Sequence, residues 1–313
     1  MKLVINIPCF NEEETLPLVL KDIPKKIPGI KKIEIQIVDD GSSDNTAAVA
    51  EKHGCRVIRH KKNLGLGIAF KHGVQTALAN GADIMVNTDA DNQYPSRFIG
   101  ELCRPVVDGT ADVVIGNRQT WKIRHFSPVK KFFQWFGSLM VRKLTGSDVR
   151  DTVSGFRAYS RESLLRLNVQ TRFSYVLDTI MQCSVKNLKM ASVDIETNRP
   201  TRKSRLFKNM LQHMIKSGGN LINIYIIYMP FMTFLTIAVL LFIPSFLIMG
   251  RFVYFFIQDG GFGHVQSLIA SAMLFLSGVL FLVLGIIANL IKVNRQLVEE
   301  TLYLQKKTYY GFR

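Results

Sequence analysis

Two aspartates one residue apart, Asp89 and Asp91, are the residues of this chain whose type and spacing most clearly indicate chemistry. They follow an apolar segment that is typical of a buried strand, and residues i and i+2 at a strand end project to the same side. The two carboxylates therefore converge, and Gln93 adds a neutral oxygen two residues later. Carboxylates this close repel unless a cation lies between them, and oxygen ligands suit Mg²⁺ or Mn²⁺ rather than zinc. The alternative is a polar loop that caps the next helix.

A second acidic pair, Asp39 and Asp40, ends another apolar segment in the stretch VDDGSSDNT. Further along this stretch, Asp44 and Asn45 are good N-cap residues for a following helix, and Gly41 permits the turn before them. The two aspartates at the strand end have no capping role. One of them is therefore a candidate acceptor for hydrogen bonds from a nucleobase or a ribose.

A glycine-containing segment, Asn63–Gly67, resembles a dinucleotide-binding loop. The fingerprint of that loop needs a third glycine at a fixed spacing, and this position is Phe70. We therefore do not expect the chain to bind NAD.

The elements that must position these residues alternate along the first part of the chain. Strands are predicted at Leu3–Ile7, Ile33–Val38, Arg56–Ile58, Ile84–Thr88 and Val113–Ile115, and helices at Glu13–Asp22, Asp44–His53, Leu66–Asn80 and Pro95–Asp108. Such alternation predicts an α/β fold with a mostly parallel sheet covered on both faces. Ligands bind such sheets at the carboxyl ends of the strands. The segments Pro8–Glu14, Asp39–Asp44 and Asp89–Gln93 all lie there.

The composition points to a membrane. The 313 residues carry a formal net charge of +16, yet 48% of them are hydrophobic, which is unusual for a soluble nucleic-acid binder. Residues 229–250 and 265–291 contain no charged side chain, and each stretch exceeds the roughly 20 residues that cross a bilayer core. We therefore expect two transmembrane helices within residues 226–292. Two buried helices of a soluble core are the alternative.

The distribution of basic residues predicts the orientation. The segment Arg251–His264 has one arginine and no lysine, whereas basic residues are frequent before the first span and after the second. By the positive-inside rule both flanks, including a tail at residues 293–313, are cytoplasmic. The first residues, MKLVINIPCF, are typical of a strand and not of a signal peptide. The cysteines show no paired spacing and are expected to be reduced thiols: Cys9, Cys55, Cys103 and Cys183.

An aromatic and basic helix is predicted over residues 126–144. It places Phe132, Phe133 and Phe136 at helical spacing among lysines and arginines. Such a stripe usually packs on a protein core. In a chain with a membrane anchor, we interpret it as a helix in the membrane interface. A second such helix is expected over residues 206–225.

Four segments in order resemble a known family: IPCFNEEETL, VDDGSSDNT, TDADNQYP and RDTVSGFRAYSR. They are similar to those of GT-A-fold, family 2 glycosyltransferases, in the subgroup that makes polyprenyl-phosphate sugars, with the dolichyl-phosphate mannose synthases and the bactoprenol glucosyltransferases. The resemblance covers about Lys2–Lys208, and the two-helix hairpin is similar to that of the bactoprenol enzymes. It implies a GT-A catalytic domain over residues 1–225.

The resemblance also implies roles for single residues. The nucleotide-binding set would be Pro8, Phe10, Glu12, Asp39 and Asp40; the metal ligands on the donor diphosphate would be Asp89, Asp91 and Gln93; and the catalytic base would be Asp151. Arg199 and Arg205 match the ends of a phosphate-gripping segment. The chain departs from the family pattern at Cys9 (often Thr), Phe10 (Tyr), Asp178 (Glu), Arg202 (Gly) and Arg205 (Lys).

Two anionic substrates would have to meet in such an enzyme. The cations expected to screen their repulsion and to bind phosphate are Arg118, Lys131, Arg199, Arg202 and Arg205. A phosphate monoester has a second pKa near 6 and needs little deprotonation at neutral pH. We therefore expect Asp151 to orient the acceptor or to take a residual proton.

The sequence thus predicts an integral membrane enzyme that transfers a hexose, with inversion and with Mg²⁺ or Mn²⁺, from a UDP- or GDP-sugar to a polyprenyl phosphate on the cytoplasmic face. A processive polysaccharide synthase is the alternative enzyme, but Trp121 and Trp135 lack the Gln-x-x-Arg-Trp context of those enzymes. A membrane-tethered nucleotide-sugar sensor is the non-enzymatic alternative. Nucleic-acid binding is not expected, because the basic residues flank apolar helices. Small residues in the second span (Gly278, Gly285 and Ala288) leave a homo-oligomer open.

Overall fold

The computed structural model describes residues 1–122, 128–169, 171, 175–198, 219, 222–223, 225–260 and 263–311. The chain forms two units, one of Met1–Lys208 with Thr301–Arg313 and one of Asn209–Glu300. The second unit begins before residue 226 and ends after residue 292, the bounds that the sequence suggested for the membrane domain.

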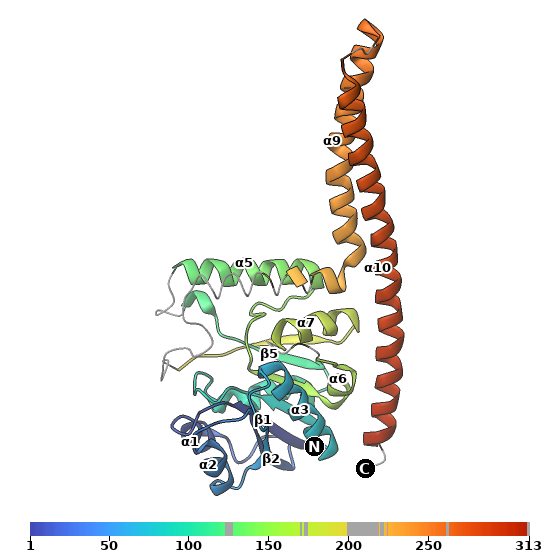
Figure 1. Ribbon diagram of the computed structural model, residues 1–313. Coiled ribbons are helices and arrows are strands. Elements are labelled where there is room, and N and C mark those ends of the chain that lie inside the picture. Colours follow the sequence, from blue (N-terminus) through green and yellow to red (C-terminus); the bar gives the residue numbers. More distant parts are fainter. Residues whose placement is uncertain are drawn as a thin grey trace. The chain divides into compact units, whose positions relative to one another are not determined.

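The first unit is built on a seven-stranded sheet (Figure 1). Its strands are β1 (Lys2–Cys9), β2 (Lys32–Asp39), β3 (Arg56–Arg59), β4 (Ile84–Asn87), β5 (Val113–Asn117), β6 (Arg157–Ser160) and β7 (Met190–Asp194), in the order β3-β2-β1-β4-β6-β5-β7. β6 is antiparallel to β4 and β5, and the other pairs are parallel. The predicted mostly parallel sheet is confirmed. β6 and β7 were not predicted, because each is short and lacks a continuous apolar run.

Helices connect these strands. They are α1 (Leu16–Asp22), α2 (Thr46–Lys52), α3 (Leu66–Ala79), α4 (Ile99–Val107), α5 (Pro128–Thr145), α6 (Arg161–Arg166) and α7 (Val176–Val185), with short 3₁₀ turns η1 (Ser96–Phe98) and η2 (Thr120–Lys122). The helices expected from the sequence between β1 and β5 are all present, with ends shifted by at most four residues. A helix also forms over most of the expected segment 126–144.

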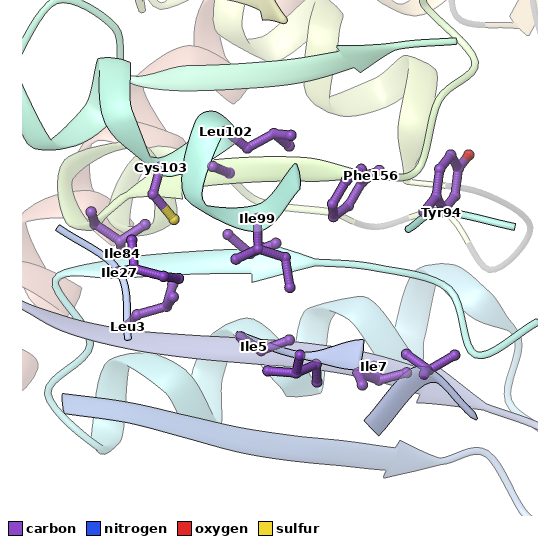
Figure 2. Close-up of a cluster of buried hydrophobic side chains, with 14 of the residues drawn as sticks. Leu3, Ile5, Ile7, Ile27, Ile84, Tyr94, Ile99, Leu102, Cys103 and Phe156 are labelled. Carbon is purple, nitrogen blue, oxygen red and sulfur yellow. The ribbon is translucent and has the colours of Figure 1, made fainter. Parts of the chain in front are cut away.

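One face of the sheet carries the main apolar core, beneath α1 and α4 (Figure 2). Alternate residues of β1, Leu3, Ile5 and Ile7, point to this face and are fully buried. Ile99 and Leu102 of α4 belong to the same buried cluster, and this helix packs against β4, β5 and β6. Full burial of each such side chain stabilises the fold by about 1.5–3 kcal/mol.

The opposite face is fixed by polar groups beneath α3. Asn6 Nδ2 donates to Asn87 Oδ1 at 2.7 Å, and Gln36 Nε2 donates to Asn6 Oδ1 at 2.8 Å and to Gly73 O at 2.7 Å. All three side chains are buried away from water, so their polar groups depend on these hydrogen bonds for partners. They join β1, β2, β4 and α3, and thereby fix the positions of the three strands relative to one another.

The second unit contains α9 (Pro230–Asp259) and most of α10 (Val265–Gly311). Both helices are long and apolar enough to cross a membrane, by length and composition. Ser245 Oγ donates to Ser271 O and Ser271 Oγ donates to Ser245 O, each at 2.9 Å, which joins the two helices. Gly278 lies against the ring of Phe242, where a Cβ would come within 2.6 Å of a ring carbon. Small and hydroxyl residues thus let the helices pack closely, as in membrane proteins.

The helix α10 does not stop where its uncharged stretch ends. It continues to Gly311 through the segment expected as a tail, and its last residues belong to the first unit. There Tyr303 Oη donates to Glu162 Oε1 at 2.9 Å, and Lys306 Nζ donates to Leu167 O at 2.9 Å. The last turns of α10 are therefore packed on α6 and the residue after it.

Candidate active site

The carboxyl ends of the central strands meet at one edge of the sheet. Cys9 at the end of β1 is in register with Asp39 at the end of β2, and Asp40 N donates to Cys9 O at 2.9 Å. β4 ends at Asn87, which is in register with Arg157 at the start of the antiparallel β6. The polar segments that follow β1, β2 and β4, and the segment that precedes β6, are thereby brought together.

The carboxylates of Asp89 and Asp91 act on each other as the sequence indicated. Burial, and then the charge of Asp91, raise the pKa of Asp89 to about 7. The backbone N–H of Gln93 donates to Asp91 Oδ1 at 3.1 Å, and Asn198 N donates to Gln93 O at 3.0 Å, which closes the turn. In the described residues no cluster of three or more His, Cys, Asp or Glu could hold a metal ion. Two mutually repelling carboxylates still fit a hard divalent cation.

Asp89 rests against the turn that precedes β6. A Cβ on Gly155 would lie 3.2 Å from Asp89 Oδ2, so the backbone approaches the carboxylate closely. Gly155 N donates to Tyr94 Oη at 3.2 Å, and Tyr175 Oη donates to Gly155 O at 3.1 Å. Burial raises the pKa of Tyr94 to about 12, so this phenol remains neutral. The two tyrosines thus clamp the backbone that supports Asp89.

Asp151 forms a buried bidentate ion pair with Arg118. Arg118 Nε donates to Oδ2 at 2.6 Å and Nη2 donates to Oδ1 at 2.9 Å, while the Arg118 and Val153 amides donate to the same carboxylate. Burial alone would raise the pKa of Asp151, but the Arg118 charge and these hydrogen bonds hold it below its ordinary value. A carboxylate so stabilised is a weak base. Arg118, expected to bind phosphate, is here the partner of Asp151.

Sequence reasoning missed Arg157, which organises the segment between Asp151 and β6. This arginine is fully buried and donates to Ser154 O, Thr152 O, Val176 O and Thr179 Oγ1. The guanidinium therefore ties the turn to the start of α7. The signal available in the sequence for a buried arginine was its position between Phe156 and Ala158, next to apolar residues.

The residues expected to bind the nucleotide follow β1 and β2. Phe10 is 39% exposed, whereas Glu12 is buried, with Oε2 accepting a hydrogen bond from Thr15 at 2.7 Å. Asp39 is fully buried, and its Oδ1 accepts from Ser42 N at 2.9 Å. Asp40 accepts from the Leu64 and Gly65 amides, both at 2.9 Å, and contacts His60. Pro8 is buried within β1.

Asp151 is one of the residues that line a pocket of about 350 Å³. The pocket lies between the end of β5, η2 and α5, and is lined by Asn117, Gln119, Thr120, Trp121, Trp135, Ser138, Arg142, Arg150, Asp151 and Asp194. The Nε atom of Arg142 is buried and has no hydrogen-bond partner among the described residues. The sequence assigned no role to Arg142 or Arg150, although Arg150 begins the segment RDTVSGFRAYSR and Arg142 lies in the predicted aromatic and basic helix. Lys131, which the sequence suggested as a phosphate-binding residue, donates a hydrogen bond to Trp121 O at 2.8 Å.

Some expected residues lie outside the described part of the chain. These are Arg199, Arg202 and Arg205, most of the expected helix 206–225, and the side chains of Phe132, Phe133 and Phe136.

The sheet, with one antiparallel strand inserted beside β4 and an Asp-x-Asp pair after β4, fits the GT-A fold of glycosyltransferases. The model of the glycosyl transferase family 2 matches residues 4–167, and the chain belongs to this family.

Two relatives of this chain have names that specify a lipid phosphate. An undecaprenyl-phosphate mannosyltransferase of Micrococcus luteus is 31% identical over 176 residues, which cover 54% of this chain and 70% of that protein. A dolichyl-phosphate hexose transferase of Haloferax volcanii is 30% identical over 193 residues, covering 62% and 81%.

A solved structure shares the fold. Glucosyl-3-phosphoglycerate synthase from Mycobacterium tuberculosis, in complex with Mn²⁺, UDP and glucosyl-3-phosphoglycerate, matches with a TM-score of 0.56 at 20% identity. The match covers 72% of this chain and 78% of that one.

Proposed function

We propose that this glycosyltransferase moves a hexose from a UDP- or GDP-sugar to a polyprenyl phosphate, with inversion, at the cytoplasmic face of a membrane. The names of the relatives support the lipid phosphate as acceptor. Two helices apolar enough to span a bilayer support an enzyme that remains with its lipid substrate. Lys and Arg are more frequent in the flanks of the two helices than in the segment that joins the helices. This distribution supports a catalytic domain on the cytoplasmic side.

The observation that carries the proposal is the position of Asp151 and Arg118. On one side, the charge of Arg118 acts on Asp89 at the metal-binding edge. On the other side, Asp151 lines a pocket that is also lined by Arg142 and Arg150. Guanidinium groups suit phosphate, so this pocket can receive an anionic acceptor beside the donor.

On the donor side, Asp89, Asp91 and Gln93 would hold a divalent cation, which supplies Lewis-acid neutralisation of the leaving diphosphate. The segments after β1 and β2 hold the nucleotide, with Phe10 the most exposed of the expected residues. The tyrosine clamp on Gly155 keeps Asp89 in place without help from the substrate.

On the acceptor side, a phosphate oxygen attacks the anomeric carbon as the bond to the diphosphate breaks. The nucleoside diphosphate leaves with the bonding electrons, and no proton has to move, because the acceptor is already largely a dianion at neutral pH. The lowered pKa of Asp151 agrees with this chemistry. Its part is to hold Arg118 between the two anionic substrates.

The test is a donor panel. Membranes containing the protein are incubated with UDP-glucose, UDP-N-acetylglucosamine or GDP-mannose and a short polyprenyl phosphate, and lipid products are separated by thin-layer chromatography. We expect one nucleotide to support transfer of a single sugar. A ladder of products would favour a processive synthase, and no lipid product with any donor would contradict the proposal.

A further inference from the structure

Two histidines outside the sequence motifs are linked to Asp40. His60, which follows β3, has its Nδ1 2.7 Å from Asp40 Oδ1, and its Nε2 lies 2.8 Å from Nδ1 of His72 on α3. The imidazole of His60 is buried, and its ring stands at 87° to that of His72. Both nitrogens of His60 are therefore engaged, in a chain that runs from the half-buried His72 to the buried carboxylate of Asp40.

The proton positions in this chain follow from elementary rules. An ionised carboxylate only accepts hydrogen bonds, so His60 Nδ1 carries a proton. When His60 is neutral, its Nε2 has no proton and accepts from His72 Nδ1–H. One added proton can be accommodated on the pair. A second would place two N–H groups against each other between the rings, and the link between His60 and His72 would break.

Asp40 in turn holds the loop that leads into α3. Its Oδ1 accepts from Leu64 N and its Oδ2 from Gly65 N, both at 2.9 Å. Gly41, directly after Asp40, packs against the backbone of Lys62 and Asn63, where a Cβ would lie within 2.8 Å of both. The orientation of one carboxylate thus decides where the residue 62–65 loop lies relative to the end of β2.

We propose that His60 and His72 are positioning residues for nucleotide-sugar binding, which fix the Asp40 carboxylate and the residue 62–65 loop at the donor edge. This rests on the proposed function, which places the nucleotide at the ends of β1 and β2. The pair acts through Asp40 and touches no reacting atom. It also makes donor binding sensitive to pH, because its hydrogen bonds tolerate only one added proton.

The charges around the pair set the direction of this sensitivity. Burial, with the neighbouring His60 and Lys71, lowers the pKa of His72, while Asp40 from β2 opposes them. Of the other charged groups near the end of β3, Arg59 pairs with Asp39, its Nε lying 3.4 Å from Oδ2. The lowered pKa of His72 keeps its ring neutral, and its hydrogen bond to His60 in place, to lower pH than for an ordinary histidine.

The experiment measures binding of UDP-glucose and GDP-mannose to the full-length protein in detergent by calorimetry, between about pH 5 and pH 8. The diphosphate of these probes is esterified at both ends and does not titrate in this range. The variants are His60→Ala, His60→Asn, His72→Ala and His72→Asn. In each Asn variant the amide nitrogen stands near the original Nδ1 and can donate, but it cannot be protonated.

We expect His60→Ala to weaken binding of the accepted donor about tenfold at neutral pH, as for loss of a hydrogen bond to a charged group, and His60→Asn to restore most of it. The Michaelis constant for the donor should rise while turnover at saturation changes little. His72→Asn should bind as the wild type does at neutral pH and should lose less affinity in acid, because its amide can rotate so that Oδ1 accepts from a protonated His60 Nε2. His53→Ala is the matched control, since this exposed ring contacts only Val49 O of its own helix among the hydrogen bonds of the described residues.

Three results would overturn the inference. One is unchanged affinity in both Ala variants at every pH. Another is an equal loss in His60→Ala and His60→Asn, which would mean that the ring only fills space. The third is an identical acid dependence in wild type and His72→Asn. If the wild type binds neither probe, the proposed function fails and this inference fails with it, whereas wild-type binding with indifferent histidines removes the inference alone.

Discussion

At the scale of single residues, Arg118 holds Asp151 in its ionised form, and this limits what Asp151 can do. A general base works best when its pKa is near the working pH, whereas the pKa of Asp151 is lowered. Because the folded-state value lies below the unfolded one, the pair contributes stability above the unfolded pKa of about 4 and loses it as the pH falls through the folded pKa. The pair therefore stays formed throughout the range in which the acceptor phosphate titrates.

The first prediction concerns this pair. Asp151→Asn should lower turnover on the order of a hundredfold through misplacement of Arg118, and should leave donor affinity nearly unchanged. In Arg118→Gln, only the backbone hydrogen bonds still oppose the effect of burial and the pKa of Asp151 should rise, so the acid limb of the rate should move to higher pH than in wild type. Steady-state kinetics against pH, with calorimetry of donor binding, measure both. Equal losses of donor affinity and turnover in Asp151→Asn would make it a binding residue.

The second prediction concerns the carboxylates after β4. Asp91→Ala should abolish transfer and Mn²⁺ binding, followed by electron paramagnetic resonance, while the protein still extracts from membranes as a folded species. Excess EDTA should have the same effect on the wild type. Asp108→Ala removes an exposed carboxylate and is the control. Full transfer in EDTA would show that no metal is needed.

At the scale of elements, the strand ends could be predicted, but the contacts that hold them could not. Asp40 and Asp89 follow apolar runs, and the parallel sheet implied by the alternating elements places such ends at one edge. Their partners come from distant segments. His60 lies 20 residues after Asp40, and Tyr175 lies 88 residues after the Asn87 that it contacts. Periodicity reports which face of an element is buried and carries no information on these long-range pairs. The same holds for Arg157, whose partners on α7, Val176 O and Thr179 Oγ1, lie about 20 residues further along the chain.

The third prediction concerns the turn before β6. Gly155→Ala would place a methyl group 3.2 Å from Asp89 Oδ2 and 3.1 Å from Tyr175 Oη, closer than ordinary packing allows. The shift needed should cost about 1–3 kcal/mol and should displace Asp89. Turnover should fall at least about tenfold, and the midpoint of thermal unfolding should fall by a few degrees. Gly100→Ala, where an added Cβ would make only an ordinary contact at 3.8 Å, is the matched control for a glycine substitution. Wild-type turnover in Gly155→Ala would mean that the contact with Asp89 is not needed.

The fourth prediction concerns α5, which we interpret as an interfacial helix. Replacing Phe132, Phe133 and Phe136 by Ser should raise the concentration of lipid acceptor needed for half-maximal rate and should spare donor binding. The same three residues changed to Leu keep an apolar side chain and serve as the control. If the triple-Ser protein uses long-chain acceptor as well as the wild type does, the helix belongs only to the protein core.

At the scale of the whole molecule, the hairpin of α9 and α10 was predictable from length and composition, but the extent of α10 was not. Residues 265–291 lack charge, and the charged residues after them suggested that the span ends there. The helix continues because nothing in the following residues breaks it and because Tyr303 and Lys306 gain partners on α6. The first charged residues after an apolar stretch therefore do not indicate where the helix itself ends.

The central claim is that the acceptor is a lipid carrying a phosphate, and its most direct measurement compares acceptors that differ only in that group. Purified protein is given its preferred nucleotide sugar, labelled in the sugar, with polyprenyl phosphate or with the unphosphorylated polyprenol of the same chain length. We predict transfer of one sugar to polyprenyl phosphate alone, in a product that mild acid hydrolyses. Equal transfer to the unphosphorylated alcohol, or a lack of transfer to polyprenyl phosphate with every donor, would contradict the claim.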